Sequence, residues 1–191
     1  MRKIILWMSM SLDGFFESLD YDISWHQVDD ELLRHMNHEL GQMGAFMHGR
    51  KTYELMAGVW PAAGNDPDLP PLMAEFAGIW CTIPKFVFSR SLTQAGWGTT
   101  VLPGVVPQHI AELKAQPGGD IALSGANLAA ALMRHGLVDE FRIYVHPIVL
   151  GQGRPLFEDP DIRLNLTLRQ THRFGNGVVL LHYANDAGPT P

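Results

Sequence analysis

The sequence of 191 residues predicts one α/β domain with three layers, in which helices cover both faces of a central mixed, mainly parallel sheet. Three observations support this prediction. The first strand is apolar on both pleat faces, which is typical of a central strand covered from both sides. Strand and helix patterns alternate through most of the chain. The last third contains long strand patterns with no helical pattern between them, which predicts an antiparallel C-terminal hairpin.

Two signals define the beginning of the chain. Residues 4–8 are uniformly apolar and predict the first strand, which ends at the turn formed by residues 11–14. From Asp29 onward, acidic residues precede leucine and methionine at helical spacing. Because short acidic side chains cap helix N-termini, this pattern predicts a helix that ends at Gly41 or Gly44.

The next segment is predicted to return to the sheet. A short strand over residues 45–47 leads into a second helix that starts near Arg50. Four of the thirteen prolines lie within residues 58–71, together with turn-forming asparagine and aspartate. Since proline and these polar residues favour turns, the segment should be an exposed loop.

Further strands and helices are predicted in alternation along the central part of the chain. A strand covers residues 85–88, whereas the pattern around Val101 defines no element. A helix over residues 107–115, a strand over 120–123 and a helix over 127–135 follow, with proline at the start of the first helix and glycine after the last.

The last third predicts strands over residues 140–146, 164–174 and 178–183. The second and third of these should form the C-terminal hairpin, which turns at Gly175-Asn176-Gly177. We expect residues 1–185 to form a single domain and residues 186–191 to be a frayed tail.

Composition excludes several classes of protein. The 14 basic and 20 acidic residues give a net charge of -6, which argues against a general nucleic-acid surface. The lone Cys81 excludes an intramolecular disulfide and a multi-cysteine zinc site, and indicates a reducing compartment, so we expect a cytoplasmic protein. No apolar stretch is long enough to span a bilayer, and the apolar start is interpreted as a strand rather than a signal peptide. The spacing of the nine histidines matches no metal motif, so no metal site is expected.

Three predicted strand ends run into small or basic residues immediately before a helix or turn, at residues 48–52, 89–90 and 124–127. A helix N-terminus offers unpaired N–H groups to a phosphate, and glycine lets the backbone approach closely. In an open α/β sheet these turns lie along the edge where ligands bind. Each glycine alone is equally consistent with an ordinary tight turn, since the sequence holds neither a G-x-G-x-x-G dinucleotide fingerprint nor a P-loop.

Longer strings of residues resemble a known family. The segments GDIALSGANL (119–128), GLVDE (136–140) and PIVLGQGRPLF (147–157) resemble the C-terminal half of the reductase domain of the bacterial riboflavin-pathway deaminase-reductase. The turns SLDG (11–14) and GRKTYE (49–54) resemble the same family and its relative, dihydrofolate reductase. The resemblance covers about residues 1–184 and implies the dihydrofolate-reductase-like form of the three-layer fold.

This resemblance implies NADPH as the hydride donor. It places the pyrophosphate near the turns at residues 49–52 and 124–128, and the adenosine 2′-phosphate near Ser89 and Arg90. Arginine suits a phosphate monoester because its planar guanidinium donates two parallel hydrogen bonds, although an exposed arginine is often only solvated. The cofactor-binding residues expected on this basis are Ser11, Gly49, Arg50, Lys51, Thr52, Ser89, Arg90, Ser124, Gly125, Ala126, Asn127 and Leu128.

Four residues are the candidates for the substrate side. Asp13 follows the first strand and Asp30 begins the first helix, near the position at which dihydrofolate reductases carry a pterin-binding carboxylate. These two are the candidate catalytic acids, and Trp25 and Glu31 the candidate substrate-binding residues. The alternatives are that the acids of the first helix only stabilise its start, that Asp13 only shapes its turn, and that Trp25 is a packing residue.

The sequence therefore predicts an NADPH-dependent oxidoreductase that transfers hydride to a small heterocyclic, carbonyl or imine substrate, similar to 5-amino-6-(5-phosphoribosylamino)uracil reductase. Two departures favour a stand-alone relative with another substrate. The deaminase zinc motif cannot be built from one cysteine, and Ser124 occupies a position where the riboflavin enzyme is expected to carry an acid. A dihydrofolate reductase proper and a non-catalytic nucleotide-binding module remain as alternatives.

The expected partners are a small-molecule substrate and a second copy of the chain, with neither nucleic acid nor membrane. A homodimer is expected because reductase domains of this family resemble one another in pairing through the C-terminal strands. Apolar area for this contact would come from Phe141, Ile143, Val145 and Ile148, which are equally consistent with a place in the core of the chain itself.

Overall fold

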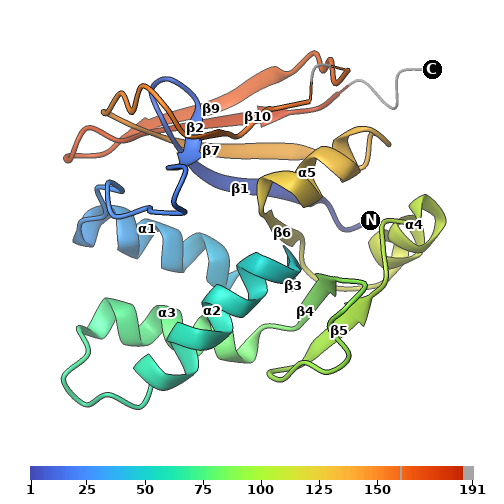
Figure 1. The fold of residues 1–191 in the computed structure, drawn as a ribbon, viewed down its shortest axis with the longest axis horizontal. Helices are drawn as coiled ribbons and strands as arrows, with labels where there is room; N and C mark the ends of the chain where they lie inside the picture. The colour runs from blue at the N-terminus through green and yellow to red at the C-terminus, as the bar shows by residue number, and fades with distance from the viewer. Residues whose placement is uncertain (160, 187–191) are drawn as a thin grey trace.

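A computed structural model describes residues 1–159 and 161–186 of the chain. Within them, eight strands form one central sheet in the order β5, β4, β3, β6, β1, β7, β10 and β9 (Figure 1). These strands are β1 (Ile4–Ser11), β3 (Ala45–Gly49), β4 (Lys85–Phe88), β5 (Thr99–Leu102), β6 (Ile121–Ser124), β7 (Glu140–His146), β9 (Thr167–Arg173) and β10 (Val179–Ala184). A separate small sheet pairs β2 (Phe15–Glu17) with β8 (Arg154–Pro155).

The central sheet is mixed and mainly parallel, as predicted. β1 pairs in parallel with β6 on one side and with β7 on the other, and the parallel pairing continues from β6 through β3 and β4 to β5. β10 runs antiparallel to both β7 and β9, which confirms the C-terminal hairpin. Gly177 adopts φ = 88° in the hairpin turn, a conformation that glycine reaches without a steric penalty. The C-terminal ends of the parallel strands therefore lie along one edge of the sheet.

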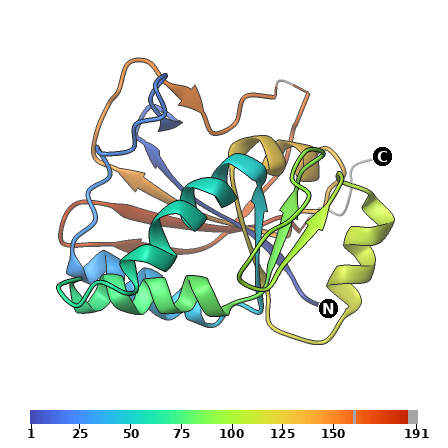
Figure 2. The same ribbon diagram turned by 60° about the horizontal axis from the view of Figure 1, so that its bottom comes forward.

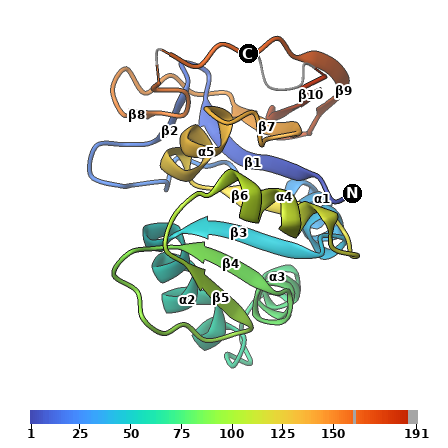
Figure 3. The same ribbon diagram turned by 90° about the vertical axis from the view of Figure 1, so that its right-hand side faces the viewer.

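Helices cover both faces of this sheet and complete the predicted three layers (Figure 3). On one face lie α1 (Asp30–Gly41), α2 (Arg50–Ala63) and α3 (Pro71–Thr82), and α3 packs beside both α1 and α2 (Figure 2). On the other face lie α4 (Pro107–Ala115) and α5 (Ala126–Met133).

Alternate residues of the strands supply two separate cores, because successive side chains of a strand point to opposite faces of the sheet. On β1, Ile5 and Trp7 pack with Leu32 of α1 and Tyr53 of α2, whereas Ile4 and Leu6 pack with residues of α4 and α5. The uniformly apolar first strand is thus explained by burial on both faces.

The structure differs from the prediction in the loop over residues 58–71, in the helix α3 and in the strand β5. The predicted loop over residues 58–71 is shorter, because α2 continues to Ala63 and α3 begins at Pro71. Pro61 lies in the last turn of α2, so the helical hydrogen bond that it removes is lost at the end of the helix and not in its middle. Pro71 occupies the first helical position of α3, where its missing N–H would have no partner. The segment around Val101 forms the edge strand β5.

Other boundaries follow from this structure. The predicted frayed tail falls mainly on residues 187–191, which lie outside the described residues, whereas Asp186 accepts a hydrogen bond of 2.6 Å from Arg169. No helix within residues 1–159 and 161–186 is long and apolar enough to cross a membrane. The same residues hold no cluster of three or more histidine, cysteine, aspartate or glutamate side chains suited to a metal ion.

Candidate functional site

A cleft of about 650 Å³ lies at the C-terminal ends of β3, β4 and β6, between the first turns of α2 and α5. It brings together the predicted cofactor residues with the exception of Ser11 and Ser124. The lining residues predicted from the sequence are Gly49, Arg50, Lys51, Thr52, Ser89, Arg90, Gly125, Ala126, Asn127 and Leu128.

Two helix N-termini meet in this cleft. Gly49 and Gly125 are the N-cap residues of α2 and α5, and neither cap has a side-chain hydrogen bond to the first turn. The first N–H groups of a helix have no partner within the helix and carry the positive end of its dipole. An uncapped N-terminus that opens into a cleft therefore suits an anionic ligand.

Gly125 adopts φ = 102°, a conformation that side chains with a Cβ rarely reach. A Cβ at this position would lie 3.0 Å from the Oγ1 atom of Thr52 on α2. The turn between β6 and α5 thus requires glycine both for its backbone conformation and for its close approach to α2.

Four cationic side chains line the cleft, and three of them have partners. Arg50 pairs with Glu54 one turn later on α2, at 2.8 Å, and Arg154 pairs with Glu17 across the small sheet. The Nζ atom of Lys51 donates to the Tyr21 hydroxyl at 3.0 Å. Arg90 is exposed, and its side chain makes no hydrogen bond or ion pair within residues 1–159 and 161–186. Arg90 is therefore the cation most readily available to a ligand.

The hydroxyl groups of Ser124 and Ser11 form hydrogen bonds outside the cleft lining. The Oγ atom of Ser124 lies 2.7 Å from Nδ1 of His48, a buried neighbour on β3. Ser11 is fully buried, where its hydroxyl donates to Asp13 at 2.7 Å and accepts from the N–H of Phe15 at 3.0 Å. Both serines are the last residues of their strands, and neither lines the cleft.

Asp13 connects the turn after β1 to the segment that follows β7 by hydrogen bonds. Its carboxylate accepts hydrogen bonds from Ser11 and from the N–H groups of Leu150 and Gly151, the last two at 3.1 and 2.8 Å. The Ser11 hydroxyl and these N–H groups hold the pKa of the Asp13 carboxyl below its ordinary value. The carboxylate is thus ionised at neutral pH, and this geometry favours the turn-shaping alternative over a proton donor.

The other three candidate substrate residues also lie outside the cleft lining. Asp29 is the N-cap of α1 and accepts from the N–H of Leu32 at 2.9 Å, and Asp30 is exposed in the first turn. Glu31 accepts at 2.8 Å from the N–H of Gly175 in the C-terminal hairpin. Trp25 packs edge-on against histidine rings, which agrees with the packing alternative.

Sequence reasoning missed one wall of the cleft. Phe16, Glu17 and Tyr21 reach it from the segment around β2, and Arg154 reaches it from β8. These two strands span only three and two residues, too few to show a periodic pattern. Arg154 lies within the segment 147–157, which resembles the reductase family, and this resemblance was the one sequence signal that could have placed Arg154 in the site.

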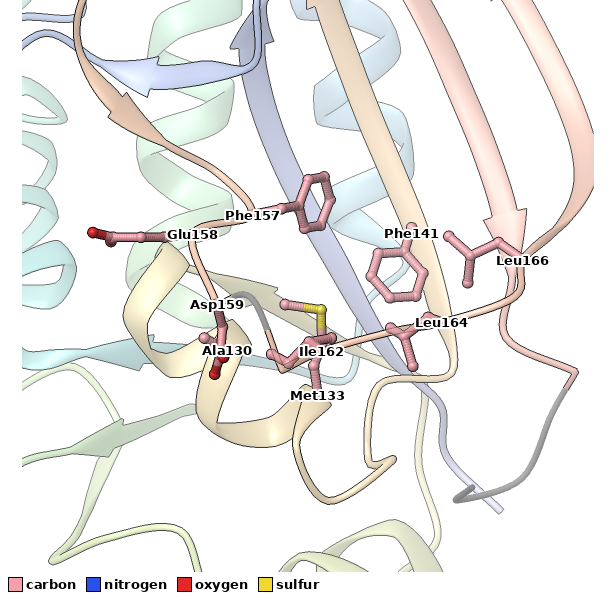
Figure 4. Close-up of a pocket in the computed structure, with 9 residues that line it drawn as sticks. All are labelled: Ala130, Met133, Phe141, Phe157, Glu158, Asp159, Ile162, Leu164 and Leu166. Carbon is pink, nitrogen blue, oxygen red and sulfur yellow. The ribbon is translucent and has the colours of Figure 1, made fainter. Parts of the chain in front are cut away.

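A second pocket, of about 220 Å³, is lined mainly by apolar side chains (Figure 4) and shares no lining residue with the cleft. It is formed by α5, β7 and the segment that follows β8, and Asp159 at its rim pairs with Arg134. Among the described residues that line it there is no helix N-terminus and no cationic side chain, so the pocket does not match the predicted cofactor. Its lining residues are Ala130, Met133, Phe141, Phe157, Glu158, Asp159, Ile162, Leu164 and Leu166.

Comparisons with known proteins agree with this architecture. The model of the RibD C-terminal domain family matches residues 2–180. The chain is 34% identical over 183 residues to the protein YyaP of Bacillus subtilis (strain 168). The alignment covers 95% of this chain and 94% of YyaP.

Two solved structures share the fold. A Shewanella sp. PV-4 protein described as a candidate riboflavin biosynthesis protein superposes with a TM-score of 0.73 at 21% identity, covering 98% of this chain and 100% of that one. The diaminohydroxyphosphoribosylaminopyrimidine deaminase/5-amino-6-(5-phosphoribosylamino)uracil reductase of Thermotoga maritima superposes with a TM-score of 0.64 at 12% identity. That superposition covers 96% of this chain but only 56% of the Thermotoga protein.

Proposed function

Because the chain belongs to the RibD C-terminal domain family, we propose that it is a reductase that uses NADPH to reduce a small heterocyclic, carbonyl or imine substrate. The observation that carries this proposal is the cleft itself. Three separate turns that sequence reasoning assigned to the cofactor line one cleft of about 650 Å³, with two uncapped helix N-termini in its wall.

The residues of the cleft fit a phosphorylated dinucleotide. The uncapped first turns of α2 and α5 would bind the pyrophosphate, and Gly125 leaves room for it where a side chain would intrude. Arg90, at the end of β4, would bind the 2′-phosphate through charge-assisted hydrogen bonds. Phe16 and Tyr21 on the opposite wall would cover the bound cofactor and exclude water.

The reaction requires little further chemistry from the chain. NADPH supplies a hydride when bound, and the protein must orient the acceptor, exclude water and leave a proton source within reach. Asp13 is ionised and hydrogen-bonded to the neighbouring turn, so it would orient the end of β1 rather than donate a proton. Asp30 in the first turn of α1 remains the candidate acid, with water as the competing source.

The substrate class can be tested by following NADPH oxidation with two acceptors, dihydrofolate and 5-amino-6-(5-phosphoribosylamino)uracil. We expect faster oxidation with a heterocycle or carbonyl compound other than dihydrofolate, because one oxygen of Glu31 is engaged by the hairpin and neither Asp30 nor Glu31 lines the cleft. NADPH binding without oxidation across a broad panel of carbonyl, imine and heterocyclic acceptors would instead support a non-catalytic nucleotide-binding module.

We also propose that the protein forms a homodimer through its C-terminal strands. Four apolar residues were expected from the sequence to form this contact, but Phe141 and Ile143 are buried in the core of the chain and supply no contact area. The contact area would instead come from exposed apolar side chains nearby, those of Val149, Phe157 and Leu168. Light scattering at micromolar concentration should give about twice the monomer mass of 21.2 kDa, and the monomer mass itself would refute the dimer.

A further inference from the structure

The loop between β2 and α1, residues 18–29, is attached to the end of β7 by a buried histidine. His146 is the last residue of β7 and is fully buried. Its Nδ1 atom accepts a hydrogen bond of 3.1 Å from the backbone N–H of Gln27. Because a backbone N–H can only donate, Nδ1 must be unprotonated, and the neutral ring carries its proton on Nε2.

A second histidine of the loop packs on the first. The rings of His26 and His146 stack with centroids 4.9 Å apart and planes at 15°, and Trp25 lies edge-on against both. The Nε2 atoms of both histidines are buried and have no hydrogen-bond partner within residues 1–159 and 161–186. A proton added to His146 must go to Nδ1, where it would displace the Gln27 N–H, and protonation of both rings would place two positive charges face to face.

We propose that His26 and His146, the histidine latch, position the loop that carries Tyr21 into the wall of the proposed cofactor cleft and release this loop when they are protonated. The contacts that form the latch do not depend on the cofactor. Its effect on cofactor affinity rests on the function proposed above.

The loop connects the latch to the cleft. Tyr21 lines the cleft, and Lys51 from the first turn of α2 donates to its hydroxyl and lies 4.6 Å from the centre of its ring. Gln27 has a second contact, in which its carbonyl accepts a hydrogen bond of 2.8 Å from the side-chain amide of Asn176 in the C-terminal hairpin. Release of Gln27 from His146 would therefore loosen the covalent segment that carries Tyr21.

Charge decides how the latch responds to pH. Burial lowers the pKa of both His26 and His146 from 6.5 to about 4, and His26 further lowers that of His146. Asp22 on the loop opposes the shift of His26, but by less than burial. The other ionisable groups around the pair are Asp13, beside the β1 residue that pairs with His146, and the acids that begin α1, Asp29, Asp30 and Glu31.

The sign of the effect follows from linkage. In the closed latch the pKa of each ring is about 4, and a loop opening that exposes the rings to water would return them toward the ordinary value of 6.5. Closure is therefore fully favoured above about pH 6.5 and weakens as the pH falls toward 4, because only the open form takes up protons. At about pH 5 the closing equilibrium should be weaker by up to about 30-fold for each histidine.

The latch can be tested without cofactor by hydrogen exchange of residues 18–28 at about pH 7.5 and about pH 5. Each variant is compared with the wild type at the same pH, which removes the intrinsic pH dependence of exchange. His146→Asn keeps an acceptor for the Gln27 N–H, and His26→Phe keeps the ring stack, but neither substitute titrates. His38→Asn, at an exposed position on α1, is the control.

At the higher pH we expect the wild type and the double variant His26→Phe/His146→Asn to protect the loop to a similar degree. At the lower pH the wild type should lose at least about tenfold more protection than the double variant, and His38→Asn should behave as the wild type. Equal loss in the wild type and the double variant would overturn the latch.

The effect on the cleft is measured with NADP⁺, the acid-stable form of the cofactor. Acidification also protonates the 2′-phosphate of NADP⁺, which weakens binding to every variant alike. The affinity of the wild type should therefore fall further than that of the double variant, by about the same factor as the difference in loop protection. Loop opening without this difference in affinity would overturn the link between latch and cleft. Absence of NADP⁺ binding at both pH values would overturn the proposed function and this link, while loop exchange would still decide the latch itself.

Discussion

Gly125→Val should abolish NADPH binding and leave a folded protein. Gly125 adopts φ = 102°, and a Cβ at this position would already lie 3.0 Å from Oγ1 of Thr52. A branched side chain would fill the space between the first turns of α2 and α5 and displace the backbone N–H groups from the ligand. We expect the dissociation constant for NADPH to rise by at least about 100-fold in a fluorescence titration, equivalent to about 2.7 kcal/mol.

The control for this prediction is Gly78→Val. Gly78 is an exposed residue of α3 without a positive φ, and a Cβ added there would meet no atom within 4 Å. This variant should bind NADPH as the wild type does. The strain at Gly125 should cost on the order of 1–3 kcal/mol of unfolding free energy, and circular dichroism with thermal unfolding separates this loss from the loss of binding. Normal NADPH affinity in folded Gly125→Val would show that the turn has only a structural role.

Arg90→Ala should weaken NADPH binding and leave NADH binding almost unchanged. Arg90 lies at the end of β4, at the same edge of the sheet as the turns after β3 and β6, and its side chain has no partner within the described parts of the chain. Charge-assisted hydrogen bonds to a phosphate contribute roughly 1.5–3 kcal/mol, and exposed ones fall at or below the lower end. We therefore expect about a tenfold increase in the dissociation constant for NADPH and a weaker dependence on salt.

Two variants sharpen this comparison. Arg163→Ala removes an exposed arginine that does not line the cleft, and should change neither cofactor affinity. Arg50→Ala should have a smaller effect on NADPH than Arg90→Ala, because Arg50 is already paired with Glu54. If Arg90→Ala weakens NADPH and NADH equally, Arg90 supports the fold or the shared pyrophosphate, and the explanation of selectivity fails.

The turns that line the proposed cofactor cleft were predictable because their signals are local. A strand end, a glycine and the start of a helix lie next to one another in the sequence at Gly49 and at Gly125. Since parallel strands place their C-terminal ends at one edge, predicting the strands was enough to predict that these turns meet. The helices α4 and α1 were also predictable, from a proline at the first position and from an acidic N-cap.

The substrate side was not predictable, because the partners of its candidate residues lie far away in the chain. Asp13 accepts hydrogen bonds from Leu150 and Gly151, and Glu31 accepts one from Gly175. Gln27, two residues after Trp25, donates one to His146. No local pattern indicates such contacts. The helix α3 was missed for another reason, since its largely apolar sequence after Pro71 lacks the polar stripe that marks a surface helix.

The central claim is that the cleft between α2 and α5 binds NADPH. It is tested most directly by titrating the protein with NADPH and with NADH while following tryptophan fluorescence. We predict saturable quenching by NADPH, with an affinity about tenfold higher than that for NADH and lost in Gly125→Val. No saturable signal with either nucleotide, or equal quenching of the wild type and Gly125→Val, would contradict the claim.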